Sequence, residues 1–170
     1  MARLTKEFFT QNALELAPML IGKLLCRKMD KEIIKLRITE TESYYGTEDT
    51  ACHAHKGKTE RTEPMFSEGG ITYIYLCYGM YNMLNIVSGK QDNPEAVLIR
   101  GVQLFNGPGK LTKALNITKD LNMIDLCLSD ELWIEDDGVI LAYKKTPRIG
   151  ISYASKEYRD KEWRFVANNL

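Results

Sequence analysis

Two charged side chains fall at positions where a β-strand should carry apolar ones. Apolar and polar residues alternate through 32–44, which predicts a strand with one face toward the core. Continuing that alternation from Ile38 places Glu42 on the apolar face, and a later strand places Arg100 among apolar residues in the same way. Because an unpaired buried carboxylate costs several kcal/mol, we expect Glu42 to project inward with Arg100 as its partner. The alternatives are a β-bulge near Thr39 or an ion pair that is only structural.

Tyrosines are concentrated in one short segment. Tyr73 and Tyr75 alternate along one face of an expected strand, and Tyr78 and Tyr81 follow at its end, where Gly79 permits a tight turn. Four tyrosines within nine residues are typical of a packed sheet face with hydroxyls at its rim. Such rings also suit stacking on nucleic-acid bases.

Metal and nucleotide motifs are weak. Cys52, His53 and His55 lie close enough to suggest zinc, but no second pair of ligands follows, so we expect no metal. The four cysteines form no C-x-x-C pair and are expected to be reduced. Gly109-Lys110 lacks the glycine that a phosphate loop needs five residues earlier, and no G-x-S-x-G elbow exists. We therefore expect no cofactor.

Opposite charges are segregated along the chain although the formal net charge is zero. Lys56, Lys58 and Arg61 are opposed only by Glu60, whereas 120–137 carries seven acids and no Lys or Arg. The zero net charge argues against a general polyanion binder. The basic group is either a solvated surface or a side that faces phosphates.

Length and composition predict one compact domain, 1–170, with 44% hydrophobic residues. The best apolar stretch, 17–25, is interrupted by Pro18, Gly22 and Lys23 and is shorter than the roughly 18 residues that cross a bilayer. The N-terminus lacks the segments of a secretory signal. We expect an intracellular protein without membrane association, in the cytoplasm or nucleoid of a bacterium or the nucleus of a eukaryote.

Periodicity and turn residues predict an α+β fold, with a curved, mostly antiparallel sheet and flanking helices. One helix should begin after Thr10 or Asn12, and another after Gly107-Pro108-Gly109. A hairpin is expected to pair 132–134 with 139–143. The other expected strands are 23–28, 32–44, 71–78, 83–87 and 96–102.

Three stretches form an ordered pattern that extends over nearly the whole chain. They are Glu40-Thr41-Glu42-Ser43-Tyr44 with Asp49 and His53; Tyr73-Ile74-Tyr75-Leu76-Cys77-Tyr78-Gly79-Met80 leading to Asn85; and Ala96-Val97-Leu98-Ile99-Arg100 followed by Gly107-Pro108-Gly109-Lys110-Leu111. This pattern resembles the alkyladenine (3-methyladenine) DNA glycosylase family. The resemblance implies an enzyme of base excision repair that releases alkylated purines, of the 3-methyladenine and 7-methylguanine type, from double-stranded DNA.

The resemblance also implies roles for individual residues. Glu42 matches the carboxylate that holds and deprotonates the attacking water, Arg100 a residue that positions this water, and the main-chain carbonyl near Ile149 a third contact. An adjacent carboxylate also stabilises the oxocarbenium-like sugar of glycosidic cleavage. The residues that match the base pocket are Tyr44, His53, Tyr75 and Asn85, with Asn85 obstructing the amino group of ordinary guanine.

The DNA-contacting residues follow from the same resemblance. Tyr78 matches the residue that wedges into the duplex where the nucleotide has been flipped out, and we expect Met80 and Tyr81 to assist it. Our candidates for phosphate anchors are Lys56, Lys58 and Arg61. No lysine stands where the family would use one for Schiff-base attack, so we expect a monofunctional enzyme that does not cut the strand. We also expect the protein to be a monomer.

Two other functions are compatible with these residues. The first is a non-catalytic nucleic-acid-binding module on the same scaffold, in which Glu42 and Arg100 form a structural pair. The second is a small-molecule transferase or hydrolase of similar fold, which would act on nucleosides without a duplex.

Overall fold

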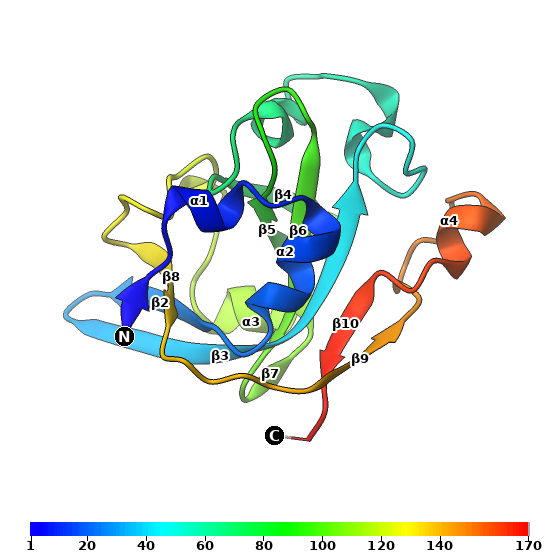
Figure 1. The fold of residues 1–170 in the computed structure, drawn as a ribbon. Helices are drawn as coiled ribbons and strands as arrows, with labels where there is room; N and C mark the ends of the chain where they lie inside the picture. Colours follow the sequence, from blue (N-terminus) through cyan, green and yellow to red (C-terminus); the bar gives the residue numbers. More distant parts are fainter. Residues whose placement is uncertain (170) are drawn as a thin grey trace.

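An antiparallel sheet runs through the computed structural model, which describes residues 1–169 (Figure 1). Its main path has the strand order β1-β8-β2-β3-β6-β5-β4, while β7 pairs with β6, and β10 pairs with both β3 and β9. The strands are β1 Ala2–Arg3, β2 Leu24–Met29, β3 Glu32–Tyr45, β4 Thr72–Cys77, β5 Tyr81–Val87, β6 Glu95–Val102, β7 Phe105–Asn106, β8 Leu132–Asp136, β9 Tyr143–Thr146 and β10 Arg164–Ala167.

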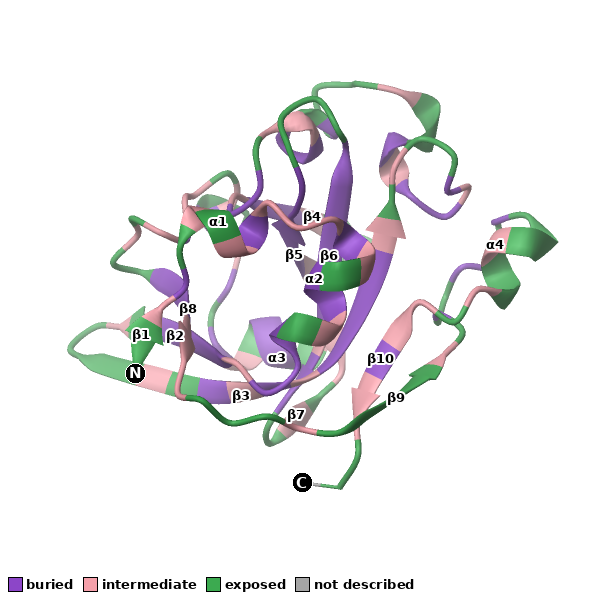
Figure 2. Ribbon diagram, viewed as in Figure 1, coloured by how far each residue is buried: buried purple, intermediate pink, exposed green. Residues whose placement is uncertain are grey.

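Short helices cover one face of this sheet. Helix α2 begins after Asn12, whose side chain accepts hydrogen bonds from the Leu14 and Glu15 amides, and its Leu16 and Leu20 are fully buried in the main core. Figure 2 shows the buried residues concentrated in the centre of the sheet and on the inner side of α2. The helices are α1 Lys6–Phe9, α2 Ala13–Leu20, α3 Pro108–Ala114 and α4 Lys156–Asp160, with 3-10 turns at His53–Lys56, Glu63–Phe66 and Lys119–Leu121. None of the helices in residues 1–169 has the length and apolar character needed to cross a membrane.

The predicted fold class is confirmed: the sheet is antiparallel and the helices flank it. The five strands expected singly are β2, β3, β4, β5 and β6, and each begins and ends within two residues of its prediction. Of the two candidate caps for the first predicted helix, Asn12 is the one that caps α2. The helix expected after Gly107-Pro108-Gly109 is α3.

The predicted hairpin of 132–134 with 139–143 is wrong. Strand β8 pairs with β2 along one edge and with β1 along the other, so neither edge is free for a returning strand. Residues 139–142 are not in a strand, and β9 pairs with β10. The turn residues at 136–138 correctly predicted a change of direction, but they carry no information about which strand the chain pairs with next.

The expected alternation along β3 is also wrong, because a bulge interrupts it at the alternative position near Thr39. The register with β6 shifts between Ile38 and Glu40 and again between Glu40 and Thr41. Ile38 lies in the main core, but after the bulge the residue that faces α2 is Thr41, whose hydroxyl donates to the Ala17 carbonyl. Glu42 therefore lies on the face opposite the helix-covered core.

The acidic stretch of the sequence pairs with basic residues from the first strands. Its carboxylates lie within ion-pair distance of lysines and arginines that precede Ile38 in the chain, so the segregation of charge along the sequence is largely cancelled in space. The pairs are Lys6–Asp125, Lys23–Asp136, Arg27–Glu131, Lys35–Glu135 and Arg37–Asp137.

Candidate active site

The carboxylate of Glu42 is completely buried on this second face of the sheet. Its Oε1 accepts a hydrogen bond from the Tyr44 hydroxyl at 3.0 Å, and its Oε2 accepts one from the backbone N–H of Ile149 at 2.7 Å. The Nη1 of Arg100 lies 3.8 Å from Oε1. The expected neighbours of Glu42 are thus brought together, although the contact from Ile149 is made by its N–H group.

A buried ion pair fixes the segment that brings Ile149 to Glu42. Arg148 makes two hydrogen bonds to Asp49, at 2.6 and 2.9 Å, and both side chains are completely buried. The guanidinium also lies between two aromatic rings, 4.9 Å from the centre of Tyr44 and 5.0 Å from that of Trp163. This packing fixes both the backbone beside Glu42 and the ring of Tyr44.

Opposing effects determine the charge state of Glu42. Burial raises the pKa of Glu42 above its ordinary value, whereas Arg100, the Ile149 N–H and the Tyr44 hydroxyl favour the ionised form and limit the rise. A carboxylate with a raised pKa is a stronger base than an ordinary glutamate. The site therefore suits the activation of a water molecule.

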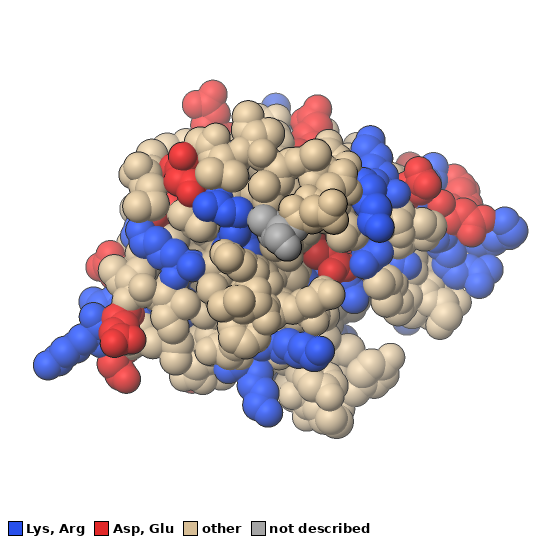
Figure 3. All heavy atoms as spheres, turned by 90° about the horizontal axis from the view of Figure 1, so that it is seen from below, with Lys and Arg blue, Asp and Glu red and all other residues tan. Residues whose placement is uncertain are grey.

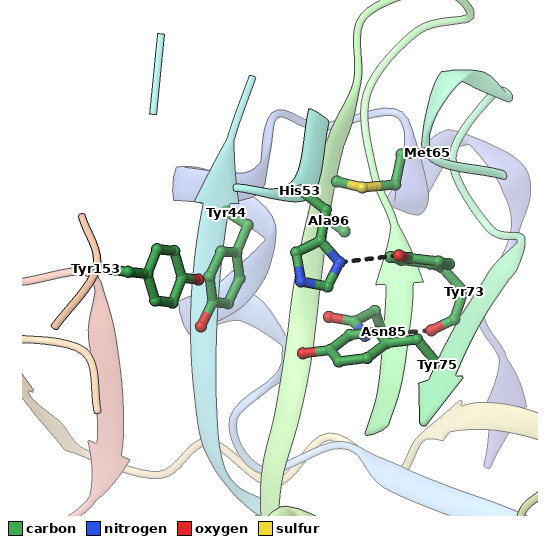
Figure 4. A pocket seen from close by; sticks show the side chains of 8 residues that line it. All are labelled: Tyr44, His53, Met65, Tyr73, Tyr75, Asn85, Ala96 and Tyr153. Atoms are coloured by element: carbon green, nitrogen blue, oxygen red, sulfur yellow. Dashed lines mark hydrogen bonds between the residues drawn. The ribbon is translucent and has the colours of Figure 1, made fainter. Parts of the chain in front are cut away.

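A pocket lined with aromatic rings opens next to Glu42. Its cavity volume is about 20 Å³, and it is lined by Tyr44, His53, Met65, Tyr73, Tyr75, Asn85, Ala96 and Tyr153. Figure 4 shows Tyr44 on one side of the pocket and His53 with Tyr75 on the other. The His53 and Tyr75 rings are packed edge to face with centroids 4.5 Å apart, so they form one continuous wall.

Burial lowers the pKa of His53 to about 4, and the nearby positive charge of Arg61 adds to this effect. The imidazole is therefore neutral near pH 7. Its Nδ1 lies 2.9 Å from the Tyr73 hydroxyl, and this hydrogen bond holds the ring in the pocket wall. A neutral ring presents an aromatic face without adding a positive charge.

Two hydrogen bonds to the backbone fix the side chain of Asn85. Its Nδ2 donates to the backbone carbonyls of Tyr73 at 3.2 Å and Met83 at 3.4 Å. Because the amide nitrogen is engaged in this way, the amide oxygen is turned toward the pocket (Figure 4). The residue thus presents a fixed acceptor to whatever occupies the pocket.

The turn between β4 and β5 carries exposed side chains. Tyr78 is 88% exposed, and Met80 and Tyr81 are also exposed. Tyr78 has a φ of +52°, a left-handed conformation that bulky residues rarely adopt. Tyr81 packs directly on α3, because a Cβ atom added at Gly109 would lie 2.7 Å from its ring.

The basic loop lies at the edge of the pocket. Lys56, Lys58 and Arg61 are all exposed, as expected for groups that contact an external partner. Arg61 does more than this, because its guanidinium lies 5.3 Å from the centre of the Tyr75 ring. It therefore contacts one ring of the pocket wall, although it does not itself line the pocket.

Sequence reasoning missed four residues of the pocket, which are Met65, Tyr73, Ala96 and Tyr153. Tyr73 was in the alternating pattern but had no role assigned, and nothing in the sequence near Met65 or Tyr153 pointed to a site. Tyr153 is fixed at the rim by a hydrogen bond from its hydroxyl to the Ala51 carbonyl at 2.8 Å. It reaches the pocket from the same segment as Ile149, which is far from the other pocket residues in sequence.

The zinc alternative has little support in the part of the chain that the structure describes. No group of three His, Cys, Asp or Glu side chains within residues 1–169 is placed to hold a metal ion. Burial raises the pKa of the Cys52 thiol to about 12, so the thiol is protonated near pH 7.

A buried carboxylate with a cation beside it, next to an aromatic pocket, is the arrangement expected of an enzyme that activates a water molecule. Comparison with known proteins gives the family. The family model described as methylpurine-DNA glycosylase matches residues 7–106 and 101–170. The chain belongs to this family and is a DNA glycosylase that acts in the repair of alkylated bases.

Individual relatives agree with this assignment. A protein of Borreliella afzelii is 45% identical, with 93% of this chain and 92% of the relative covered. Proteins of Natranaerobius thermophilus and Methanocella arvoryzae are 42% and 40% identical, with 96% and 98% of this chain and 94% and 92% of the relatives covered. All three carry the name "Putative 3-methyladenine DNA glycosylase".

Proposed function

We propose that the protein binds duplex DNA, flips an alkylated purine of the 3-methyladenine or 7-methylguanine type into the aromatic pocket, and hydrolyses its bond to deoxyribose without cutting the strand. The observation that carries this proposal is the buried carboxylate of Glu42, hydrogen-bonded to Tyr44 of the pocket wall and 3.8 Å from Arg100. We propose that the protein acts as a monomer.

Glu42 has two tasks in this reaction. It accepts the proton of the attacking water, and its negative charge stabilises the oxocarbenium-like sugar as the base departs. Arg100 keeps Glu42 ionised and helps to hold the water, while the hydrogen bonds from Tyr44 and Ile149 fix the direction of the carboxylate. The released base leaves as the neutral purine when alkylation has already placed a positive charge on it.

The pocket selects the damaged base. An alkylated purine carries a positive charge, so the faces of Tyr44 on one side and of His53 with Tyr75 on the other attract it by cation–π interaction, about 0.5–2 kcal/mol per contact. The neutral state of His53 avoids repulsion of that charge. Because its two backbone hydrogen bonds fix the Asn85 side chain, it cannot move aside for the exocyclic amino group of ordinary guanine, which is discrimination by steric clash.

Flipping needs a group that fills the space left in the duplex. Tyr78, at the exposed tip between β4 and β5, is our candidate for this wedge, with Met80 and Tyr81 beside it. Lys56, Lys58 and Arg61 anchor the phosphates next to the pocket. Insertion has to offset a stacking cost of a few kcal/mol, so both groups contribute to flipping.

Incubation with methylated calf-thymus DNA tests the proposal, because only an enzyme releases free methylpurines. We expect wild-type protein to release them and Glu42→Gln to abolish release while its affinity for damaged duplex stays within about threefold. Glu95→Gln is a matched control, since Glu95 is also a buried carboxylate but bonds to the Ala13 amide at the start of α2.

The outcomes separate the candidate functions. Excision at close to the wild-type rate by Glu42→Gln would remove Glu42 from the mechanism. Tight binding to damaged duplex without release by the wild-type protein would favour a non-catalytic binding module. Cleavage of methylated nucleosides in the absence of a duplex would favour a small-molecule hydrolase, and a single-turnover panel of 3-methyladenine, 7-methylguanine and hypoxanthine substrates ranks the bases.

A further inference from the structure

A second carboxylate, that of Glu40, is buried two residues before Glu42 on β3. Its side chain is 7% exposed, and its Oε1 accepts hydrogen bonds from two arginines, from Nε of Arg100 at 2.9 Å and from Nε of Arg164. Arg164 lies on β10, directly across from Glu42 in the strand register. Nothing in the reaction proposed above uses Glu40.

Arg100 therefore lies between two carboxylates. Its Nε is bound to Glu40, while its Nη1 points to Glu42 at 3.8 Å, a distance too long for a direct hydrogen bond. An arginine side chain has many rotamers, so an ion pair at one end of the guanidinium fixes the direction of its other donors. The only hydrogen bond from the Arg100 side chain in the part of the chain described is the one to Glu40.

The bulge in β3 creates this arrangement. Thr39 is the extra residue on β3, and Arg100 is the extra residue on β6, between the pairs Glu40–Gly101 and Thr41–Ile99. A bulge re-aims the side chains next to it, and here it turns Glu40 and Glu42 to the same face, with Arg100 between them. A regular strand would have kept both carboxylates on the face of Ile38.

We propose that Glu40 is a positioning residue for catalysis, which holds the guanidinium of Arg100 against Glu42 while Arg164 holds Glu40. This inference rests on the proposed function. It predicts that Glu40 acts through Arg100 and does not touch the substrate. It also gives β10 a part in the active site, although β10 supplies none of the pocket residues.

The pH dependence of excision reports the protonation of Glu42, and a residue with a purely structural role would not change it. Titratable and charged groups from five parts of the chain face Glu42. They are Glu40 and Tyr44 on β3, Tyr75 on β4, Arg100 on β6, Arg164 on β10, and Arg148 and Tyr153 in the 148–153 segment. If Glu40 is removed, Arg100 is free to leave and Glu42 loses its nearest cation. If Glu40 is instead replaced by an uncharged group that still accepts the hydrogen bond, Arg100 stays and its charge is no longer shared with a second carboxylate.

Two substitutions at this position should therefore have opposite effects on the pH dependence of excision. For Glu40→Ala we expect a single-turnover rate at least tenfold lower, up to about hundredfold, and an acid limb that moves to higher pH by about one unit. For Glu40→Gln we expect a rate within about threefold of wild type and an acid limb that moves to lower pH, because the uncompensated cations stabilise the Glu42 carboxylate. Both are measured with the enzyme in excess of the damaged duplex and at a concentration above the dissociation constant.

Asp137→Asn is the matched control, since Asp137 also pairs with a partly buried arginine, Arg37 on β3, but outside the site. We expect its limb to coincide with wild type. Acid limbs of the two Glu40 variants that stay in place, or move in the same direction, would overturn the inference. If Glu40→Ala does not fold, as judged by thermal unfolding, Glu40→Gln decides alone: a limb at lower pH supports the inference, and an unmoved or higher limb overturns it. Absence of excision by the wild-type protein would instead reject the proposed function.

Discussion

At the scale of single residues, burial determines the protonation states that the pocket needs. Glu42 and His53 both lie in a poorly solvated site, and each is thereby driven toward its neutral form. The outcome differs because hydrogen bonds and Arg100 oppose this effect at Glu42, whereas Arg61 adds to it at His53. A basic carboxylate and a neutral imidazole can therefore coexist within one small site.

The lowered pKa of His53 should affect stability in acid. The unfolded chain binds a proton at His53 near pH 6.5, but the folded protein does so only near pH 4, so this contribution to stability is present above pH 6.5 and is lost as the pH falls toward 4. We expect the difference in unfolding free energy between wild type and His53→Gln to shrink by up to about 3 kcal/mol between pH 7 and pH 4. Urea unfolding at a series of pH values measures it, and a constant difference would contradict the neutral state.

At the scale of elements, the β4–β5 turn combines strain with exposure. Tyr78 adopts a left-handed backbone conformation yet buries almost none of its side chain, so the fold gains little from having a tyrosine there. Gly79 next to it also has a positive φ, +65°, which its missing Cβ permits without cost. Strain at a bulky, exposed residue is characteristic of a functional position.

Replacing Tyr78 should separate stability from function. Asn tolerates a positive φ, so Tyr78→Asn should raise the unfolding free energy by roughly 0.5–1 kcal/mol and also weaken base flipping. Thermal unfolding measures the first effect, and fluorescence of 2-aminopurine next to the lesion measures the second. Met80→Asn is the control for the stability effect, because Met80 is exposed at the same tip but does not have a positive φ. Unchanged fluorescence with Tyr78→Asn would reject the wedge.

The stability contributed by the ion pair between Arg37 on β3 and Asp137, just after β8, should also depend on pH. Arg37 holds the pKa of Asp137 down to about 2, below the 3.8 of an ordinary aspartate. The stability from this pair is present above pH 3.8 and is lost as the pH falls through about 2. Asp137→Asn should therefore lower the melting temperature at pH 7 and have little effect near pH 2. Asp130→Asn, at an exposed aspartate on the loop before β8, is the control, and an equal loss at both pH values would contradict the assignment.

At the scale of the whole molecule, the surface charge is mixed. Figure 3 shows Lys and Arg groups spread around one face with Asp and Glu among them, which agrees with the net charge of zero. Lysines and arginines elsewhere in the fold pair with much of the acidic stretch, as in Lys35–Glu135. The exposed lysines of the basic loop therefore remain available to an external partner. DNA attraction should therefore come from a few local contacts and not from the overall charge.

The salt dependence of DNA binding tests this expectation. Neutralising one phosphate contact should reduce the slope of log affinity against log salt concentration by about one, so the double substitution Lys56→Gln with Lys58→Gln should reduce it by about two. Fluorescence anisotropy with a damaged duplex over a range of salt measures the slope. Lys31→Gln, at the distant turn between β2 and β3, should leave the slope unchanged. A slope that is the same in the double variant and in wild type would remove this loop from the DNA contacts.

The sequence by itself predicted five of the strands, two candidate caps for the first predicted helix and the candidate residues of the site. These features depend on neighbours within a few residues: alternation predicts a strand such as β3, and Asn12 caps a helix through its own side chain. The order of motifs identified the family resemblance, and the comparisons agree with it. Glu42 was correctly expected to be buried close to Arg100, but not on the face that the alternation predicted.

Only the tertiary structure decided which face those residues occupy and what surrounds them. The bulge at Thr39 turns Glu42 away from the helix-covered core, and its burial comes instead from the segment that carries Ile149 and Tyr153. The partners of β8 and the role of Glu40 likewise depend on strands far apart in the chain. Local sequence patterns cannot specify such features, because strand register and long-range pairing depend on the packing of the whole sheet.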